Sequence, residues 1–449
     1  MMMRTSSPVS QPTFAEARRF WLKLGFVSFG GPAGQIALMH QVLVEEKRWI
    51  SDAKFLHALN YCLLLPGPEA QQLATYIGWL LHGPRGGLAA GVLFVLPSAG
   101  ILLVLSLLYV TLGTVPALQS IFQGLKPAVL AIILLALVRM GQKSLLSPLH
   151  YTVAAVSFGG IFFLNIPFPL LILGAAAVGL LAQRVTLSDA LTATAARVPA
   201  SQTEDSYYLT TRSGGPGPGF SGARLLRQAA TALLLWAAPL ALLGVAGPDA
   251  TFWCTLVLFF TQAAFVTFGG AYAVLPYVAQ VSVEKLHWLT QSQMLDGLAL
   301  GETTPGPLIM VLAFVGFMGG YTHFSGSLAL GTVALLTTTY YTFLPSFVFI
   351  LLGAPLVERT QHNARLQTVL SCVAAAVAGV MLNLAVYVGR SMLFPAGSPL
   401  TLARLHWPEM MWLLVSLAAL RLFRVHLMLW IGVSAGAGWL YYLLGSFGG

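Results

Sequence analysis

The chain has 449 residues, of which 57% are hydrophobic and only 8% are charged. A soluble domain typically carries about 25% charged residues, so 23 basic and 14 acidic side chains are too few to cover a water-facing surface of this size. Apolar stretches such as 91–112 are continuous and do not alternate every second residue, which excludes a β-barrel. The composition therefore predicts an all-α polytopic membrane protein.

The net charge of +9 does not indicate nucleic-acid binding, because the basic residues stand singly at the ends of apolar runs and form no cluster. Cys62, Cys254 and Cys372 lie far apart in apolar runs, which predicts buried thiols and no metal site. Phosphate-binding loops, zinc-protease motifs and nucleophile elbows are absent. We therefore expect neither a cofactor nor an enzyme, and no transport driven by ATP bound to this chain.

A long internal repeat organises the sequence. The stretch Phe26-Val-Ser-Phe-Gly-Gly31 returns 239 residues later as Phe265-Val-Thr-Phe-Gly-Gly270, and the same shift superimposes two Pro-Gly-Pro motifs. Without a gap, 15 of the 43 positions from Phe26 to Pro68 are identical. Because Trp, Gly and Pro coincide as well as aliphatic residues, the two halves are interpreted as a duplicated unit.

Both units show the same predicted elements in chain order: a segment broken by Gly-Gly, a segment broken by Pro-Gly-Pro, two long helices and two short ones. The long helices are expected at 86–112, 116–140, 328–352 and 364–389, and the short ones at 149–164, 168–183, 410–420 and 425–444. The predicted organisation is a first unit at 14–183, a flexible cytoplasmic linker at 184–228, an extra transmembrane helix at 229–250 and a second unit at 251–449.

Lys and Arg positions predict the orientation, because they gather at the cytoplasmic ends of membrane helices. Basic residues within 18–23 place the N-terminus in the cytoplasm. Those within 139–143 and 421–424 place the end of the second long helix and the turn between the last two short helices there. The extra helix then crosses, so that the second unit begins on the other side and Gly449 lies outside. Arg390 and Arg404 also fall outside and count against this arrangement. On balance we expect two inverted repeats with broken or re-entrant helices, as in many secondary transporters.

The paired breaks are the candidate binding site. Pro and Gly interrupt a helix and leave backbone groups unpaired, which the membrane interior tolerates only where they line a cavity or are buried in protein. A helix that begins at such a break presents free N–H groups and a positive dipole end, which suit an anion. A plain kink is the alternative for a single motif, but matched breaks in both halves favour a site. The candidate substrate-binding residues are Gly30, Gly31, Pro32, Pro66, Gly67, Pro68, Gly269, Gly270, Pro305, Gly306, Pro307 and Lys23.

Charged residues inside the apolar stretches are few. Glu69 follows a Pro-Gly-Pro motif in the first turn of a helix, where a carboxylate is also favourable for structural reasons. Glu302 lies near a helix C-terminus, where the dipole disfavours a negative charge, so it is the stronger candidate for coupling transport to an ion. Its structural alternative is a hydrogen bond across helices, for example to Thr303. Lys23 either neutralises an anion or extends to the membrane interface.

These motifs resemble the chromate ion transporter superfamily in its long, two-unit form. The similar stretches include 26–32, 49–51, 65–68 and 76–78 in the first half, and 297–308, 314–317, 342–345, 353–355, 358–359 and 383–384 in the second. The resemblance implies export of chromate across the bacterial plasma membrane, driven by the membrane's ion gradient, with chromate resistance as the result. Glu69 departs from the family pattern, which leads us to expect a small polar residue such as Asn after Pro-Gly-Pro.

We therefore expect a multi-pass secondary active exporter of a tetrahedral dianion, chromate, with sulfate as a competitor. A permease for sulfate or another oxyanion is the alternative within the same class. An intramembrane enzyme should show a nucleophile–base pair, and a membrane scaffold would have no use for paired breaks. Lipid is the expected environment, and a homo-oligomer is left open.

Overall fold

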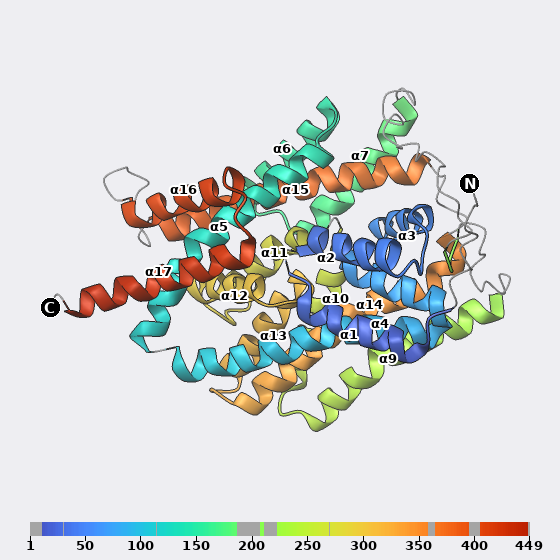
Figure 1. Cartoon of the computed structure of the whole chain (residues 1–449), viewed down its shortest axis with the longest axis horizontal. Helices are drawn as coiled ribbons and strands as arrows, with labels where there is room; N and C mark the ends of the chain where they lie inside the picture. Colours follow the sequence, from blue (N-terminus) through green and yellow to red (C-terminus); the bar gives the residue numbers. More distant parts are fainter. Residues whose placement is uncertain are drawn as a thin grey trace, which may run out of the picture.

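A computed structural model describes residues 11–29, 31–113, 115–185, 207–210, 222–268, 270–357, 364–394 and 405–447. Within these ranges every regular element is a helix, apart from one isolated bridge between Ile50 and Leu209 (Figure 1). Among the described residues, six helices are long and apolar enough to cross a membrane. The predicted class, an all-α polytopic membrane protein made of two units with broken helices, is confirmed.

The first unit contains two broken segments, two long helices and a hairpin. Its elements are α1 (Phe14–Val27), α2 (Gly31–His40), the π-helical turn η1 (Gln41–Glu46), α3 (Asp52–Leu64), α4 (Glu69–Leu112), α5 (Pro116–Ser144), α6 (Pro148–Leu164) and α7 (Phe168–Val185). The sequence predicted a separate helix from Gly86, but α4 begins at Glu69 and bends at His82 and Gly83, whose backbone angles are not helical. Gly83 has a φ of 64°, which glycine adopts without strain.

The second unit repeats this order after one additional helix, α9 (Gly222–Ala246). Its elements are α10 (Ala250–Phe265), α11 (Ala271–Gln280), η3 (Val281–Lys285), α12 (Gln291–Thr303), η4 (Leu308–Met310), α13 (Val311–His323), α14 (Leu328–Val357), α15 (Ala364–Leu393), α16 (Trp407–Arg421) and α17 (Leu427–Phe447). The shift between equivalent residues is 239 in the broken segments, 248 in α5 and α15, and 259 in α6 and α16. The shift increases along the chain because the loops between helices are longer in the second unit than in the first.

The two units are interleaved rather than placed side by side. Helix α5 of the first unit packs against α16 and α17 of the second, while α15 of the second packs against α6 and α7 of the first. Glycines allow close approach at both crossings, since Gly124 lies against the backbone of α17 and Gly379 lies against the backbone of α6. Helices α5 and α15 are therefore each covered by the hairpin of the other unit.

The non-helical part of the expected linker is shorter than the sequence predicted, and residues 207–210 within it are hydrogen-bonded to the first unit. Helix α7 ends at Val185 and α9 begins at Gly222, so both ends of the expected 184–228 linker are helical. Residues 207–210 lie along the first unit, where Ser51 N–H donates to the Leu209 carbonyl (2.8 Å) and Leu209 N–H donates to the Trp49 carbonyl (3.0 Å). Residues 186–206 and 211–221, like Gly449, lie outside the described ranges.

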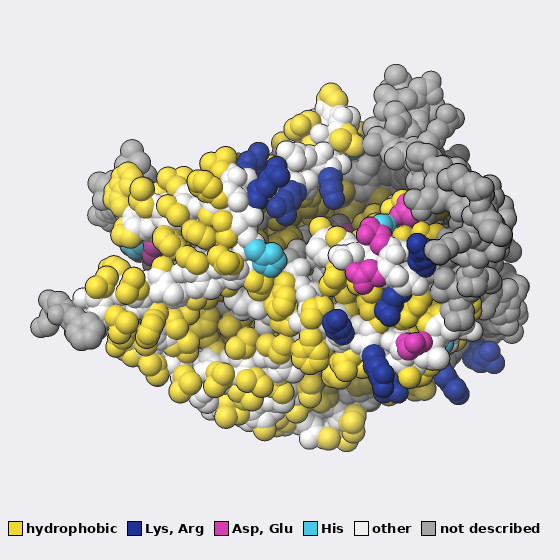
Figure 2. All heavy atoms as spheres, viewed as in Figure 1, with side chains coloured by type: hydrophobic (Ala, Val, Ile, Leu, Met, Phe, Trp, Pro, Cys, Tyr) yellow, Lys and Arg dark blue, Asp and Glu magenta, His cyan; other side chains and the backbone are white. Residues whose placement is uncertain are grey.

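The outer surface carries large apolar side chains, as a lipid-facing protein requires. Many Leu and Phe residues of α6, α7, α9 and α17 are more than 40% exposed. On the face drawn in Figure 2, yellow side chains cover most of the left and lower parts, and the Lys, Arg, Asp and Glu side chains lie above a hollow in the upper centre and to its right. The interior is apolar as well, and its largest cluster joins α5, α10, α12, α13 and α15.

Candidate functional site

The four helix breaks meet in pairs, and each pair joins the two units. The Gly67 N–H of the first Pro-Gly-Pro motif donates to the Thr267 carbonyl of the second unit (2.7 Å). The Gly306 N–H of the second motif donates to the Ser28 carbonyl of the first unit (2.8 Å). Because Gly67 corresponds to Gly306 and Ser28 to Thr267, the two bonds are equivalents. The breaks therefore satisfy each other's backbone groups inside an apolar protein.

A serine of α4 or α14 packs against each Pro-Gly-Pro loop. Ser98 of α4 donates through Oγ to the Pro305 carbonyl, and its equivalent Ser346 of α14 lies against Gly67. Gly67 and Gly306 have φ values of 130° and 96°, which favour glycine. A Cβ atom at either glycine would overlap the facing serine oxygen. The loops thus need glycine for their backbone angle and for their close packing.

Two buried glutamines add bonds that the units do not share. Gln35 of α2 donates through Nε2 to the Gly306 carbonyl, whereas its equivalent in the second unit is Val274. Gln72 of α4 donates to the Pro66 carbonyl (2.7 Å). The Pro-Gly-Pro loops are therefore held from several sides, and the Gly67 and Gly306 N–H groups are engaged by protein carbonyls.

A large cavity of about 1500 Å³ opens beside the Gly-Gly breaks. Gly31 and Pro32, at the start of α2, line it from the first unit, and Gly270, immediately before α11, lines it from the second. The first N–H groups of an α-helix have no partner within the helix, and Gly270 provides no side-chain cap. Two helix N-termini therefore meet at this cavity, and their dipoles favour a negative charge there.

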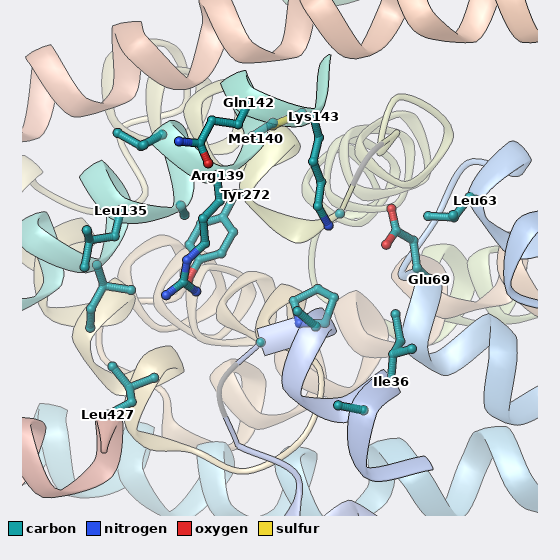
Figure 3. Close-up of a pocket in the computed structure, with 18 of the residues that line it drawn as sticks. Ile36, Leu63, Glu69, Leu135, Arg139, Met140, Gln142, Lys143, Tyr272 and Leu427 are labelled. Atoms are coloured by element: carbon teal, nitrogen blue, oxygen red, sulfur yellow. The ribbon is translucent and has the colours of Figure 1, made fainter. Parts of the chain in front are cut away.

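The cavity wall is rich in positive charge. Its lining includes four Lys and Arg residues, with Arg139 and Lys143 near the end of α5, Arg421 at the end of α16 and Arg424 just after it. Two glutamates, Glu45 and Glu69, also line it. Figure 2 shows Lys and Arg side chains gathered along one rim of the hollow. In the close-up, Arg139 and Lys143 extend into the cavity from α5 (Figure 3). The arrangement suits a small anion that enters from the basic rim.

Two acidic residues lie close to this cavity in different settings. Glu69, at the start of α4, lines the wall and points toward Lys143 across the open space (Figure 3). Glu302, at the end of α12, is buried behind the wall and accepts a hydrogen bond from the Tyr272 hydroxyl (2.8 Å). Tyr272 itself lines the cavity beside Arg139 (Figure 3). Thr303, the partner considered from the sequence, instead donates to the Leu300 carbonyl.

The structure places the residues chosen from the sequence in three groups. Gly31, Pro32, Gly270 and Glu69 line the cavity. Pro66, Gly67, Pro68, Pro305, Gly306, Pro307 and Glu302 lie outside its lining, and Lys23 is exposed on α1. Gly30 and Gly269 lie outside the described ranges.

Sequence reasoning used the basic residues of the rim only to assign orientation. Arg139, Lys143, Arg421 and Arg424 were all placed on the cytoplasmic side, although they come from different units. Their shared cytoplasmic side was the signal from which a common basic surface could have been predicted. What the sequence did not reveal was that α5 and the α16–α17 hairpin pack together across the units.

Comparison with known proteins identifies the family. The sequence model for "Chromate transporter" matches residues 15–180 and 254–439, which is most of the chain. The chain belongs to the chromate transporter family. It is therefore a membrane transporter rather than a typical enzyme, and the resemblance seen in its motifs is confirmed.

Three relatives cover most of the length of the chain. A "Chromate transport protein" of Pseudomonas aeruginosa is 33% identical over 375 residues, 80% of this chain and 77% of its own. A "Probable chromate transport protein" of Synechococcus elongatus is 28% identical over 84% of both chains. A "Chromate transport protein" of Cupriavidus metallidurans is 29% identical over 76% of this chain and 74% of its own. No solved structure matches the chain.

The close packing of the two Pro-Gly-Pro loops yields a first prediction. Gly67→Ala and Gly306→Ala should each destabilise the protein by about 1–3 kcal/mol, because alanine is strained at these angles and its Cβ overlaps Ser346 or Ser98. We expect a lower unfolding temperature in detergent and reduced chromate transport in cells that express either variant. Gly100→Ala is the control, since Gly100 is helical and, apart from the backbone of its own helix, no atom lies within 4 Å of its Cβ position. Wild-type unfolding temperatures in both loop variants would contradict the role assigned to the glycines.

Proposed function

We propose that this member of the chromate transporter family exports chromate from the cytoplasm across the bacterial plasma membrane, as a secondary active transporter that confers chromate resistance. One observation carries the proposal: the cavity beside the converging breaks is lined by Arg139, Lys143, Arg421 and Arg424. Chromate is a tetrahedral dianion, and Arg and Lys bind such oxyanions through charge-assisted hydrogen bonds. The N-termini of α2 and α11 add donors at the inner end of the cavity.

The side on which the cavity opens supports the proposed direction. The ends of α5 and α16 that carry its basic rim are the ends that the positive-inside rule assigns to the cytoplasm. The cavity thus presents its cations to anions inside the cell. Expelling a dianion from an inside-negative cell is also electrically favourable, by about 2.3 kcal/mol per charge at 100 mV.

Glu69 and Lys143 face each other on the cavity wall. The Lys143 ammonium points toward the Glu69 carboxylate (Figure 3), so the positive charge of the wall is partly offset. An arriving dianion competes with Glu69 for the same lysine. Repulsion between the Glu69 carboxylate and the bound dianion then favours release, which a transporter needs and a storage site does not.

Glu302 is the candidate for coupling to protons. It is 7% exposed, and Tyr272 connects it to the cavity through a hydroxyl hydrogen bond. A charged acidic residue at a helix centre costs roughly 2.5–3.5 kcal/mol in the membrane, and none of the ion pairs among the described residues involves Glu302. A proton that reaches Glu302 through Tyr272 would neutralise the site between transport cycles. Export of the dianion does not require that proton for energy.

Sulfate is the second candidate substrate. It has the same shape and charge as chromate, and a cavity of about 1500 Å³ is large enough for either ion with its water. Long-range attraction to the four cations of the rim does not distinguish the two anions. We therefore expect sulfate to compete with chromate.

The basic rim can be tested by removing its charges. Arg139→Gln and Lys143→Gln should each weaken chromate capture roughly ten- to hundredfold, because a charge-assisted hydrogen bond contributes about 1.5–3 kcal/mol. We expect lower chromate tolerance and more intracellular chromium in cells that express either variant at wild-type levels. Lys23→Gln is the matched control, because Lys23 is exposed outside the cavity. Equal chromate tolerance in all three variants and the wild type would argue against binding at this rim.

The coupling role of Glu302 predicts a change in pH dependence. Glu302→Gln keeps the shape and the Tyr272 contact but cannot release a proton, so chromate flux should become independent of pH between about 6 and 8. Flux into everted vesicles would be measured at fixed membrane voltage. Tyr272→Phe should slow the flux and retain some pH dependence, because the carboxyl group remains. A Glu302→Gln profile that follows the wild type would leave Glu302 with a structural role only.

A further inference from the structure

A second, smaller cavity of about 240 Å³ lies between α6, α11 and α15. Its polar lining consists of Asn165, Gln280, Glu284, Asn383, Tyr387 and Arg390. No part of the proposed mechanism uses these residues. Their positions in the repeat nevertheless relate this cavity closely to the large one.

Each residue of the small cavity corresponds to a residue of the large cavity. With the shifts of 239, 248 and 259 residues defined above, Gln280 corresponds to Gln41, Asn383 to Leu135 and Asn165 to Arg424. The remaining pairs, small cavity first, are Ile161 and Leu420, Phe162 and Arg421, Pro276 and Ala37, Glu284 and Glu45, Leu384 and Ala136, Val386 and Val138, Tyr387 and Arg139, and Arg390 and Gln142. The two cavities are thus the same region of the fold, built once from each unit.

The two cavities lie toward opposite ends of one membrane-spanning helix. Ala374 and Met381 of α15 line the large cavity, and residues from Asn383 to Arg390, up to 16 residues beyond Ala374, line the small one. Sixteen residues of α-helix extend about 24 Å, which is most of the thickness of the hydrocarbon core. Under the predicted topology, the small cavity therefore lies toward the outer side.

An ion pair holds α5 and α12 together. Lys126 of α5 lies 3.2 Å from the Asp296 carboxylate of α12, and both side chains are largely buried. Tyr109 of α4 donates to the same carboxylate (2.9 Å), and Lys126 also donates to Ser292 (2.8 Å). Three helices are thus joined by one polar cluster.

The equivalent contact in the other half is open. Lys126 corresponds to Ala374, which lines the large cavity, and Asp296 corresponds to His57 on α3. Facing residues of α3, such as Leu56 and Leu63, line the large cavity too. Their equivalents on α12 are Leu295 and Glu302, which are only 5% and 7% exposed. Two equivalent interfaces therefore differ, one open and one closed by charges.

We propose that the small cavity is the closed exit vestibule of the transport path, and that the Lys126–Asp296 ion pair holds it closed while the large cavity is open. In the alternative state α12 separates from α5, α3 packs against α15, and the small cavity widens to the size of the present large one. Asn383, Gln280 and Arg390 then line the exit with hydrogen-bond donors for an oxyanion. This inference rests on the proposed function, because only a transporter needs an exit.

Single cysteines at equivalent positions can report both vestibules. In a Cys254→Ser background, whose remaining described cysteines, Cys62 and Cys372, are buried, Asn383→Cys marks the small cavity and Leu135→Cys the large one. A membrane-impermeant maleimide is applied to intact cells and, separately, to everted vesicles. Asp296→Asn should accelerate labelling of Asn383→Cys in intact cells about tenfold, because the partner charge is lost. It should slow labelling of Leu135→Cys in everted vesicles.

Two further variants separate gating from general loosening. The charge exchange Lys126→Asp with Asp296→Lys should return both labelling rates toward those of the parent. Asp249→Asn removes another contact, with His323 (2.9 Å), and should leave both rates unchanged. An unchanged rate at Asn383→Cys in the Asp296→Asn variant, or a rise at both cysteines together, would overturn the proposal.

The labelling does not depend on chromate, so the two proposals can fail separately. Opposite changes at the two cysteines would support the exit vestibule even in a protein that carries no chromate. Unchanged labelling in a protein that does carry chromate would reject the vestibule and leave the proposed substrate intact.

Discussion

The crossed pair of backbone hydrogen bonds, from Gly67 to Thr267 and from Gly306 to Ser28, is the constraint on which the remaining structure depends. A broken helix leaves polar backbone groups that cannot be hydrated inside the membrane, at a cost of several kcal/mol for each group. Each unit satisfies part of this requirement with a carbonyl of the other unit. Neither unit can therefore form its break correctly alone, and the centre of the protein is fixed to the junction of the two halves.

The symmetric backbone carries an asymmetric set of side chains. Glu302 corresponds to Leu63, and Arg139 corresponds to Tyr387. The basic rim therefore exists on one side only, and a buried carboxyl group stands behind the cavity in one unit only. A repeated backbone can offer two equivalent arrangements of similar energy, while unequal side chains decide which anion enters and from which side. The energetic difference between the two arrangements rests on few polar contacts, of which Lys126–Asp296 is the best defined.

The sequence predicted the parts of the fold that depend on local pattern. Hydropathy identified the helices, the 239-residue repeat identified the two units, and Pro and Gly located the breaks. It did not predict which break pairs with which, because a Pro-Gly-Pro motif contains no signal for its partner. The interleaving of α5 with α17 was hidden for the same reason, since apolar helices suit many neighbours equally well. Arg139 therefore served only as an orientation signal, and Tyr272, 30 residues before Glu302, was not considered as its partner.

Chromate uptake into everted membrane vesicles tests the central claim most directly, that a cavity between the two interlocked units carries a tetrahedral dianion out of the cytoplasm. Everted vesicles expose the cytoplasmic face, so the large cavity faces the added chromate. The account predicts saturable chromate uptake that sulfate reduces and equimolar chloride does not, and that vesicles without the protein lack. Uptake that is equal with and without the protein, or that appears only in right-side-out vesicles, would contradict it.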